Sequence, residues 1–504
     1  MANVFQSTPI RRIRRNSFDL SHDVKFSGTM GKLIPTLIQE VLPGDSFKIN
    51  SENLIRFAPM VSPVMHSIKC FTHYFFVPNR IVYDKWEDFI SPDLSKDTPP
   101  SAPYFKVADF TQISKGSLSD YLGLPIGSTD VYQGINVNAI PFAAYQKIYN
   151  EYYRDQNLIS EVPDKLVSGA NNYFNTEYNL LRNRAWMHDY FTSALPFQQK
   201  GPAVNIPIDY GDAVFPIRNA GSAGLINFSG GGSTNVLAAD SGSGPIPNNT
   251  LYGNMKDAEG AGMQSTIADL RLAMRLQEWF ELAARGGSRY VEQLKVFWNV
   301  NSSDKRLNRP EFLGGTRVPV VISEVLQTSS SDGTTPQGTM AGHAISGSYG
   351  NTIRYRAEEH GFIIGIMSVM PNTAYQQGIH RMWSRDSWED YAWPQFAHLS
   401  EQPILNKELY VANDGKNDDT FGFIPRYSEY RYTPSRVAGD FRDTLAFWHL
   451  GRQFTNRPLL NKDFIECNPS NRIFAVTTGD NLWCHTYHKI RVKRALPQYG
   501  VPTL

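Results

Sequence analysis

VMHSIKCFTHYFFVP, residues 64–78, is the stretch that most clearly decides the fold. Aromatic and β-branched side chains dominate it, and the turn-forming pair Pro78 and Asn79 ends it. This composition predicts a β-strand.

Further strand candidates lie on both sides of this stretch. They are HGFIIGIMSVMP (residues 360–371), NRIFAVTT (471–478), NLWCHTYHKIRVK (481–493) and shorter runs at 47–57 and 318–326. Turn-rich segments of uneven length separate them, without regular alternation of strands and helices. The pattern predicts a mainly β chain built as an antiparallel sandwich rather than a parallel α/β sheet.

Three segments are predicted to be helices: residues 141–156, 265–287 and 290–298. In the second, Thr266 and Asp269 have the spacing of a capping box, with Asp in place of the usual Glu or Gln. Ser288 is the expected cap of the third. We expect all three helices to pack on the core.

The bulk composition is that of a folded protein. Of 504 residues, 41% are hydrophobic and 19% are charged, which excludes a disordered chain. Three cysteines far apart argue against a disulfide framework. The first fifteen residues lack the apolar segment of a secretory signal, and the longest apolar run, GFIIGIMSVM, is too short to span a bilayer. We therefore expect no membrane insertion.

One long segment, residues 201–262, differs in composition from the rest. It holds 12 of the 38 glycines and only two basic residues, Arg218 and Lys256. A loop of this length inside a compact chain is usually functional or disordered. A surface insertion is favoured over a plain interdomain linker, because strongly apolar segments flank it.

Charge is concentrated at two places. The chain has a net charge of +1, but residues 1–32 and residues 481–504 each sum to +4, which leaves −7 for residues 33–480. An acidic body with two basic ends suggests that the ends contact a polyanion.

Strand alternation in residues 485–494 places Lys489, Arg491 and Lys493 on one face together with Tyr487. A cationic surface with an aromatic platform is typical of single-stranded nucleic acid binding, although edge-strand lysines that discourage aggregation give the same pattern. The predicted nucleic-acid-binding residues are Arg11, Arg12, Arg14, Arg15, Lys489, Arg491, Lys493 and Arg494.

Motifs for chemistry are weak. Cys484, His485 and His488, with Cys467 upstream, suggest zinc by composition. In a strand, however, His485 and His488 point to opposite faces, whereas tetrahedral ligands must converge. The sequence contains no phosphate-binding loop and no zinc-protease or serine-hydrolase motif. We predict no catalytic residues, no metal and no cofactor.

Several long stretches resemble a known family. They are RNSFDLSHDVKFSGTMGKLIPTLIQEVLPGDSF, HDYFTSALPFQQKGP, ARGGSRYVEQLKVFW, NRPEFLGG, TAYQQGIHRMWSR and YAWPQFAHLSEQPILNKELY. Together and in this order they resemble the major capsid protein of gokushoviruses, small circular single-stranded DNA bacteriophages of the Microviridae. The resemblance covers nearly the whole chain, except residues 201–262.

The resemblance implies an eight-stranded antiparallel jelly roll of the viral capsid type, with long inter-strand insertions and a few helices. Residues 1–504 would form one capsid domain with a basic arm at 1–32, a basic segment at 481–504 and a threefold protrusion at 203–262. Copies of the chain would self-assemble in the host bacterial cytoplasm into a T=1 icosahedral virion shell around a circular single-stranded DNA genome. Implied partners are a small basic DNA-packaging protein, a DNA pilot protein and a host surface receptor.

Other interpretations remain open at this point. In one hypothesis the arginines of residues 11–15 neutralise the phosphates of packaged DNA. In the other, the N-terminal arm that carries them mainly binds a neighbouring subunit. A soluble glycan-binding or glycan-cleaving β-sandwich protein has similar loops and aromatic residues. A monomeric single-strand-binding protein would share the basic ends.

Overall fold

The structure is a computed structural model that describes residues 14–92, 98–106, 112–128, 135–205, 217–219, 251–253, 266–328 and 337–499. Contacts divide the chain into two compact units. The first comprises residues 1–198 and 287–504, and the second comprises residues 199–286.

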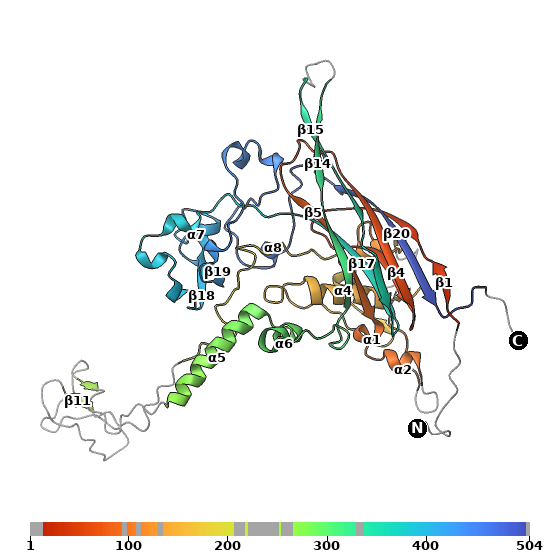
Figure 1. Cartoon of the computed structure of the whole chain (residues 1–504), viewed down its shortest axis with the longest axis horizontal. Helices are drawn as coiled ribbons and strands as arrows, with labels where there is room; N and C mark the ends of the chain where they lie inside the picture. The colour runs from red at the N-terminus through yellow and green to blue at the C-terminus, as the bar shows by residue number, and fades with distance from the viewer. Residues whose placement is uncertain are drawn as a thin grey trace, which may run out of the picture. The chain divides into compact units, whose positions relative to one another are not determined.

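The first unit is mainly β, as predicted, and its larger sheet has seven strands. Their order is β1-β20-β4-β15-β14, with β2 also paired to β20 and β16 also paired to β4, and every pairing is antiparallel (Figure 1). The strands are β1 (Asn16–Asp19), β2 (His22–Gly28), β4 (Ser46–Phe57), β14 (Val321–Leu326), β15 (Met340–Tyr349), β16 (Ile353–Arg356) and β20 (Leu482–Arg494).

The second sheet has four antiparallel strands in the order β13-β5-β17-β3. They are β3 (Ile34–Val41), β5 (Ile68–Pro78), β13 (Glu311–Pro319) and β17 (Gly361–Pro371). The stretch at residues 64–78 thus contains β5, a central strand that starts at Ile68 and is paired on both edges. Every residue of β17 is buried, which explains its uninterrupted apolar sequence.

The two sheets pack face to face around the main core. In β4, buried and more exposed residues alternate, so that Phe47 and Ile49 point inward. They pack with Leu37 of β3, Phe76 of β5 and Ile363 of β17. Burial of the inner face of each sheet is the main stabilising contribution to such a sandwich.

The other face of the four-stranded sheet is covered by helices α1 (Asn79–Val82) and α4 (Ile140–Ile148). Phe75 of β5 and Phe142 of α4 belong to this second core. The hydroxyl of Tyr145 donates to the carbonyl of Leu33, 2.8 Å away. The helix predicted at residues 141–156 is confirmed as far as Tyr153, because a π-helix at Tyr149–Tyr153 continues α4.

A lobe of short elements lies beside the sandwich, at the left of Figure 1. It contains β18 (Glu401–Leu405), β19 (Thr420–Pro425), α7 (Asn406–Leu409) and α8 (Lys462–Ile465). Tyr190, Phe191, Tyr375, Ile404 and Phe464 belong to its own small core.

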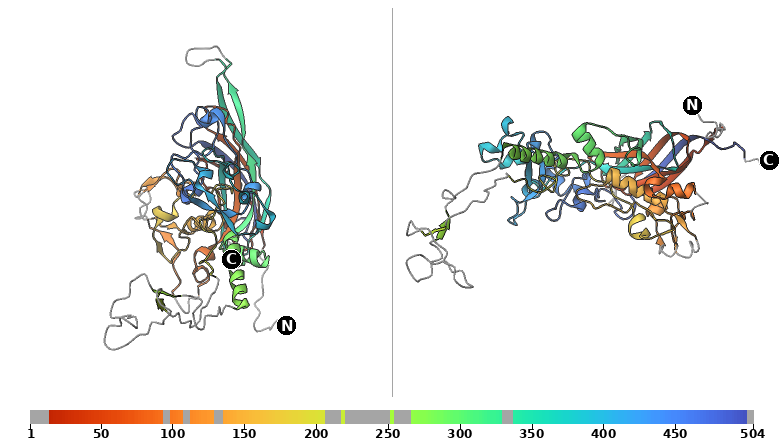
Figure 2. Two further views of the ribbon diagram at one scale, coloured as in Figure 1. Left: turned by 90° about the vertical axis from the view of Figure 1, so that its left-hand side faces the viewer. Right: turned by 90° about the horizontal axis from the view of Figure 1, so that it is seen from below.

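The remaining elements of the first unit are short. They are α2 (Trp86–Ile90), α3 (Leu118–Tyr121), α6 (Tyr290–Trp298), β6 (Tyr104–Phe105), β7 (Gln112–Ile113), β8 (Gly127–Ser128), β9 (Val137–Asn138), β10 (Ala170–Asn171), a second π-helix at Phe174–Tyr178, and 3-10 helices at Arg381–Ser384, Trp388–Asp390, Pro394–Phe396, Ser428–Tyr430, Gly439–Arg442 and Ala446–Trp448. Strands β14 and β15 extend beyond the other strands as a two-stranded ribbon, in green in Figure 2, because β15 pairs with β4 only from Ile345 onward.

The second unit contains helix α5 (Ile267–Gly286) and the strand pair β11 (Ile217–Asn219) and β12 (Leu251–Gly253). The predicted capping box is confirmed. The backbone N–H of Asp269 donates to Thr266 Oγ1 at 3.1 Å, and the backbone N–H of Thr266 donates to the Asp269 carboxylate at 3.0 Å. Most of the predicted insertion at residues 203–262 lies outside the described residues.

One strand prediction was wrong, and the bounds of a second need correction. Residues 471–478 form turns with one isolated bridge, between Met60 and Phe474, rather than a strand. Ile473 and Phe474 are buried in the sandwich core. The apolar residues of this run therefore reflect core packing and not pairing in a β-strand. The run at residues 318–326 is divided at Val320 between β13 and β14, which belong to different sheets.

Two helix predictions also need correction. Trp279 of α5 and Trp298 of α6 are exposed, so only α4 of the three predicted helices packs into a core. The N-cap of α6 is Arg289, while the hydroxyl of Ser288 donates to Gln156 Oε1 at 2.8 Å. Within the part of the chain that the structure describes, no helix is long and apolar enough to cross a membrane.

Candidate nucleic-acid interface

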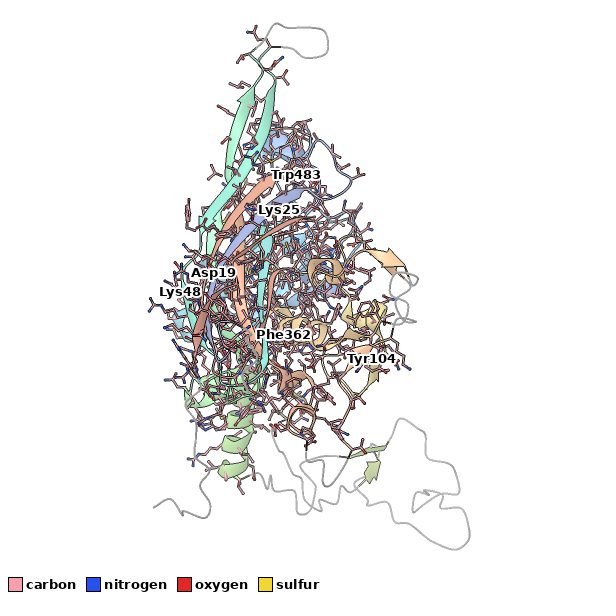
Figure 3. All side chains as sticks on the ribbon, turned by 90° about the vertical axis from the view of Figure 1, so that its right-hand side faces the viewer. Asp19, Lys25, Lys48, Tyr104, Phe362 and Trp483 are labelled. Carbon is pink, nitrogen blue, oxygen red and sulfur yellow. The ribbon has the colours of Figure 1, made fainter. Side chains whose placement is uncertain are left out.

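Strand β20 confirms the predicted alternation. Lys489, Arg491 and Lys493 are exposed, whereas Ile490 and Val492 are buried. One side of the strand therefore enters the sandwich core and the other side forms part of an open surface. Asp19, Lys25, Lys48 and Trp483 are labelled along this sheet in Figure 3.

Strand pairing adds cations that lie far away in the sequence. Lys48 of β4 is opposite Arg491, and Arg354 of β16 is opposite Lys48. Arg356 follows two residues later on the same side. We call the resulting surface the cationic face, and it consists of Lys48, Arg354, Arg356, Lys489, Arg491 and Lys493.

Sequence reasoning missed Lys48, Arg354 and Arg356. Alternation within residues 46–57 was a usable signal for Lys48, since its neighbours Phe47 and Ile49 are apolar. No local signal placed β4 beside β20 or β16 beside β4, because these pairings join segments hundreds of residues apart.

The charges of the cationic face are largely unneutralised. Across residues 14–499, in the parts that the structure describes, no carboxylate lies within 4.0 Å of the side-chain nitrogens of these six residues. Asp19 is opposite Arg491 on β1. Hydrogen bonds from Ser21, and more weakly the charges of Arg491 and Lys489, lower the pKa of Asp19. This carboxylate is therefore ionised and offsets one positive charge.

Arg494 has a different environment from the other predicted residues. Its Nη2 and Nε lie 2.7 and 2.9 Å from Oδ2 of Asp45, whose side chain is only 1% exposed. Its Nη2 also donates to the carbonyl of Glu40 at 3.1 Å. The guanidinium is thus engaged within the subunit, and a role in nucleic-acid binding stays a prediction for this residue.

The two basic ends of the sequence meet in space. Asn16 of β1 is paired with Arg494 of β20, so Arg14 and Arg15 lie just beyond the same end of the sheet. Both arginines are exposed, and the Arg15 guanidinium lies against Gly44, where a Cβ would collide with it. The predicted residues Arg11 and Arg12 lie outside the described residues.

The histidines face opposite sides of β20, as predicted. His485 Nε2 lies 3.3 Å from the Asp23 carboxylate on the open surface. His488 is fully buried, and its Nε2 donates to the Thr36 carbonyl at 2.8 Å while Nδ1 accepts from the Ser51 hydroxyl at 2.7 Å. Burial lowers the pKa of His488 to about 4. Both ring nitrogens are occupied, so this side chain is part of the core.

Comparison with known proteins places this surface in context. The sequence model of the phage family "Capsid protein (F protein)" matches residues 6–504. Capsid protein VP1 of Chlamydia phage 1 is 37% identical over 589 aligned positions, which cover 100% of this chain and 98% of the relative. Capsid protein VP1 of Bdellovibrio phage phiMH2K is 38% identical over 534 positions, which cover 99% and 97%.

A more distant relative gives the same result. Capsid protein VP1 of Spiroplasma virus 4 is 30% identical over 540 positions, which cover 98% of this chain and 96% of the relative. The chain therefore belongs to the phage capsid protein (F protein) family, in the gokushovirus group of the Microviridae, and is a structural protein of the virion that assembles with copies of itself rather than an enzyme.

Proposed function

We propose that copies of this capsid protein form a T=1 icosahedral shell around a circular single-stranded DNA genome, with the cationic face toward the DNA. The observation that carries the proposal is the row of exposed cations across β20, β4 and β16, which have no carboxylate within 4.0 Å among the described residues. The arginines of residues 11–15 would extend this surface, because β1 starts beside the end of β20.

The chemistry of the surface fits a flexible polyanion. The six exposed cations of the cationic face attract phosphates regardless of base sequence. Trp483 and Tyr487 lie on the same side of β20 and offer aromatic rings on which bases stack. Binding of this kind is strong at low salt and weakens steeply as salt is added.

We infer that the sandwich is an eight-stranded jelly roll. The orders β2-β20-β4-β15 and β3-β17-β5-β13 support this topology, since each sheet then alternates strands from early and late in the chain. On this reading β1, β14 and β16 extend the first sheet, and the helices and the lobe are insertions between strands.

We also propose that residues 203–262 form a threefold surface protrusion that meets a receptor on the host cell. The separate grouping of residues 199–286 and their Gly-rich composition support an insertion into the capsid domain. Assembly would take place in the host cytoplasm, with a small basic DNA-packaging protein and a DNA pilot protein as further partners.

The test removes three charges from the cationic face. Lys489→Gln, Arg491→Gln and Lys493→Gln are combined in one full-length variant, and shells are purified from bacteria that express the phage structural genes. The matched control carries Lys85→Gln, Lys115→Gln and Lys416→Gln, which remove the same charge from exposed positions outside both sheets. DNA content is measured from the ratio of absorbance at 260 and 280 nm.

We expect the triple variant to assemble with normal yield but to hold less DNA than the control and the wild type. Equal DNA content in variant and control would contradict the proposed orientation. Loss of assembly in the absence of DNA would assign the face to a subunit contact instead.

A further inference from the structure

The lobe carries an unusual concentration of exposed aromatic side chains. We call it the aromatic surface, and its members, with the exposed fraction of each residue, are Trp383 (75%), Trp388 (61%), Tyr391 (54%), Trp393 (44%), Tyr430 (53%) and Tyr432 (39%). It lies on the loops that precede β18 and follow β19, at the left of Figure 1.

The aromatic surface is ordered by contacts among its own side chains. The Arg385 guanidinium lies between two rings, 5.4 Å from the centroid of Tyr391 and 4.5 Å from that of Tyr430. The indole N–H of Trp393 donates to the carbonyl of Trp388 at 3.0 Å, and their rings meet edge to face. The indole N–H of Trp393 is thus satisfied within the lobe, while the side chains of Trp383 and Trp388 remain mostly exposed.

A hollow adjoins the aromatic surface. It is a cavity of about 1120 Å³, and Met382, Trp383, Tyr430 and Val437 are among the residues that line it. Aromatic, methionine and arginine side chains around a concavity are the composition that marks the centre of protein–protein interfaces.

The exposed area is that of an interface. From the exposed fractions given above, the six aromatic residues together present on the order of 700 Å². The largest apolar patch on a typical monomer is about 300–600 Å². A standard specific interface buries about 800 Å² on each partner. The aromatic surface alone therefore supplies most of what one stable contact requires.

The charges around the hollow favour a protein partner with an acidic surface. Arg381 and Arg385 are already paired with Glu408 and Glu429, at 3.4 Å in each case. Arg436 and Arg442 also line the hollow and are exposed. Residues 33–480 of this chain sum to −7, so another copy offers acidic groups to these arginines.

We propose that the aromatic surface is a contact between capsid subunits and is covered by a second copy of this chain in the assembled shell. Family membership supplies the partner, because a capsid subunit must bury several surfaces against its own copies. The inference is independent of the proposed DNA contact, which concerns exposed residues of the seven-stranded sheet and not the lobe.

The first test is a variant with Trp383→Ser and Trp388→Ser in the full chain. Both side chains are mostly exposed, so the subunit should fold, which circular dichroism and thermal unfolding will verify. We expect the subunit concentration needed for assembly, measured by sedimentation, to rise at least tenfold. The matched control is Tyr349→Ser, an aromatic residue of β15 that is 86% exposed and lies in the seven-stranded sheet.

A second measurement does not depend on mutants. Hydroxyl-radical footprinting compares the oxidation of Trp383 and Trp388 in wild-type shells and in dissociated subunits. We expect at least fivefold protection in shells, including empty shells without DNA. Equal oxidation in both states, or normal assembly of the double variant, would overturn the proposal. Protection only in DNA-filled shells would overturn it in favour of a nucleic-acid contact.

Discussion

Arg494 shows how one buried partner changes what a surface cation does. Arg491 and Lys493 on the same strand are exposed, but Arg494 is held by Asp45, which also accepts a hydrogen bond from the backbone of Leu42 at 3.1 Å. A buried carboxylate that loses its cation is costly to the fold.

We therefore predict that Arg494→Gln lowers the free energy of unfolding by about 3 kcal/mol, because Asp45 would remain buried without a counter-charge. Lys493→Gln, one residue away and exposed, should change it by less than about 0.5 kcal/mol. Urea unfolding of dissociated subunits measures both. Equal effects of the two substitutions would refute a structural role for Arg494, and Asp45→Asn combined with Arg494→Gln should recover part of the loss.

His488 predicts a pH dependence of stability. Its pKa is about 4 in the folded protein, below the usual value of 6.5, chiefly because burial disfavours the charged ring. Between pH 4 and pH 6.5 the unfolded chain binds more protons than the folded chain. The stabilisation that depends on a neutral His488 is therefore fully present above pH 6.5 and is lost as the pH falls toward 4. The contribution of this residue is on the order of 3 kcal/mol.

Replacement of the ring tests this. His488→Asn should reduce the slope of unfolding free energy between pH 6.5 and 4.5, as followed by denaturant titrations at several pH values, while His73, whose pKa burial also lowers to about 4, keeps part of it. His485→Asn, on the exposed side of the same strand, should leave the slope as in the wild type. Parallel curves for wild type and His488→Asn would show that this histidine does not govern acid sensitivity.

At the scale of elements, the sequence predicted what local periodicity determines. Strands β5, β17 and β20 and helix α4 were expected at nearly their observed positions. Apolar content alone wrongly predicted a strand at residues 471–478, where turns carry buried side chains such as Phe474. It also wrongly predicted that α5 and α6 pack on the core, because large apolar side chains of both helices are exposed in a single copy. Alternation within β20 predicted its three cations of the cationic face. Lys48 and Arg354 were not predicted, because they join this face only through strand pairing.

The connection between β2 and β3 predicts a second effect on stability. Gly31 has a φ of +85°, and a Cβ at this position would collide with the backbone carbonyl of Cys467. Gly31→Ala should therefore destabilise the subunit by about 3 kcal/mol, from left-handed strain plus overpacking. Gly116→Ala has a similar φ of +78° but open space around it, and should cost about 1 kcal/mol. Thermal unfolding compares the two, and equal losses would mean that the contact with Cys467 is relieved by a small shift.

At the scale of the whole molecule, charge is separated between an acidic body and two basic segments that the pairing of β1 and β20 brings together. With such a distribution, subunits can contact one another through one surface and bind a polyanion through another.

This separation predicts a specific salt dependence. Binding of single-stranded oligonucleotides to dissociated subunits, followed by fluorescence anisotropy, should weaken linearly on a plot of log affinity against log salt. The combined Lys489→Gln, Arg491→Gln and Lys493→Gln variant should reduce that slope by about 2, because each phosphate contact contributes about 0.7 on single strands. The Lys85, Lys115 and Lys416 control variant should keep the wild-type slope. A slope that does not change in the first variant would place the DNA contacts elsewhere.

The central place of β20 has a consequence for biosynthesis. This strand fills the gap between β2 and β4, although the ribosome makes it hundreds of residues after them. Until β20 leaves the ribosome, the seven-stranded sheet lacks its central strand. The inner faces of β4 and β17 then lack the apolar side chains that β20 contributes to the core. Such long-range pairing makes folding slow and largely post-translational. A prematurely terminated chain lacks β20 and therefore cannot complete the sandwich. Only subunits that have been translated through β20 can fold and join a growing shell.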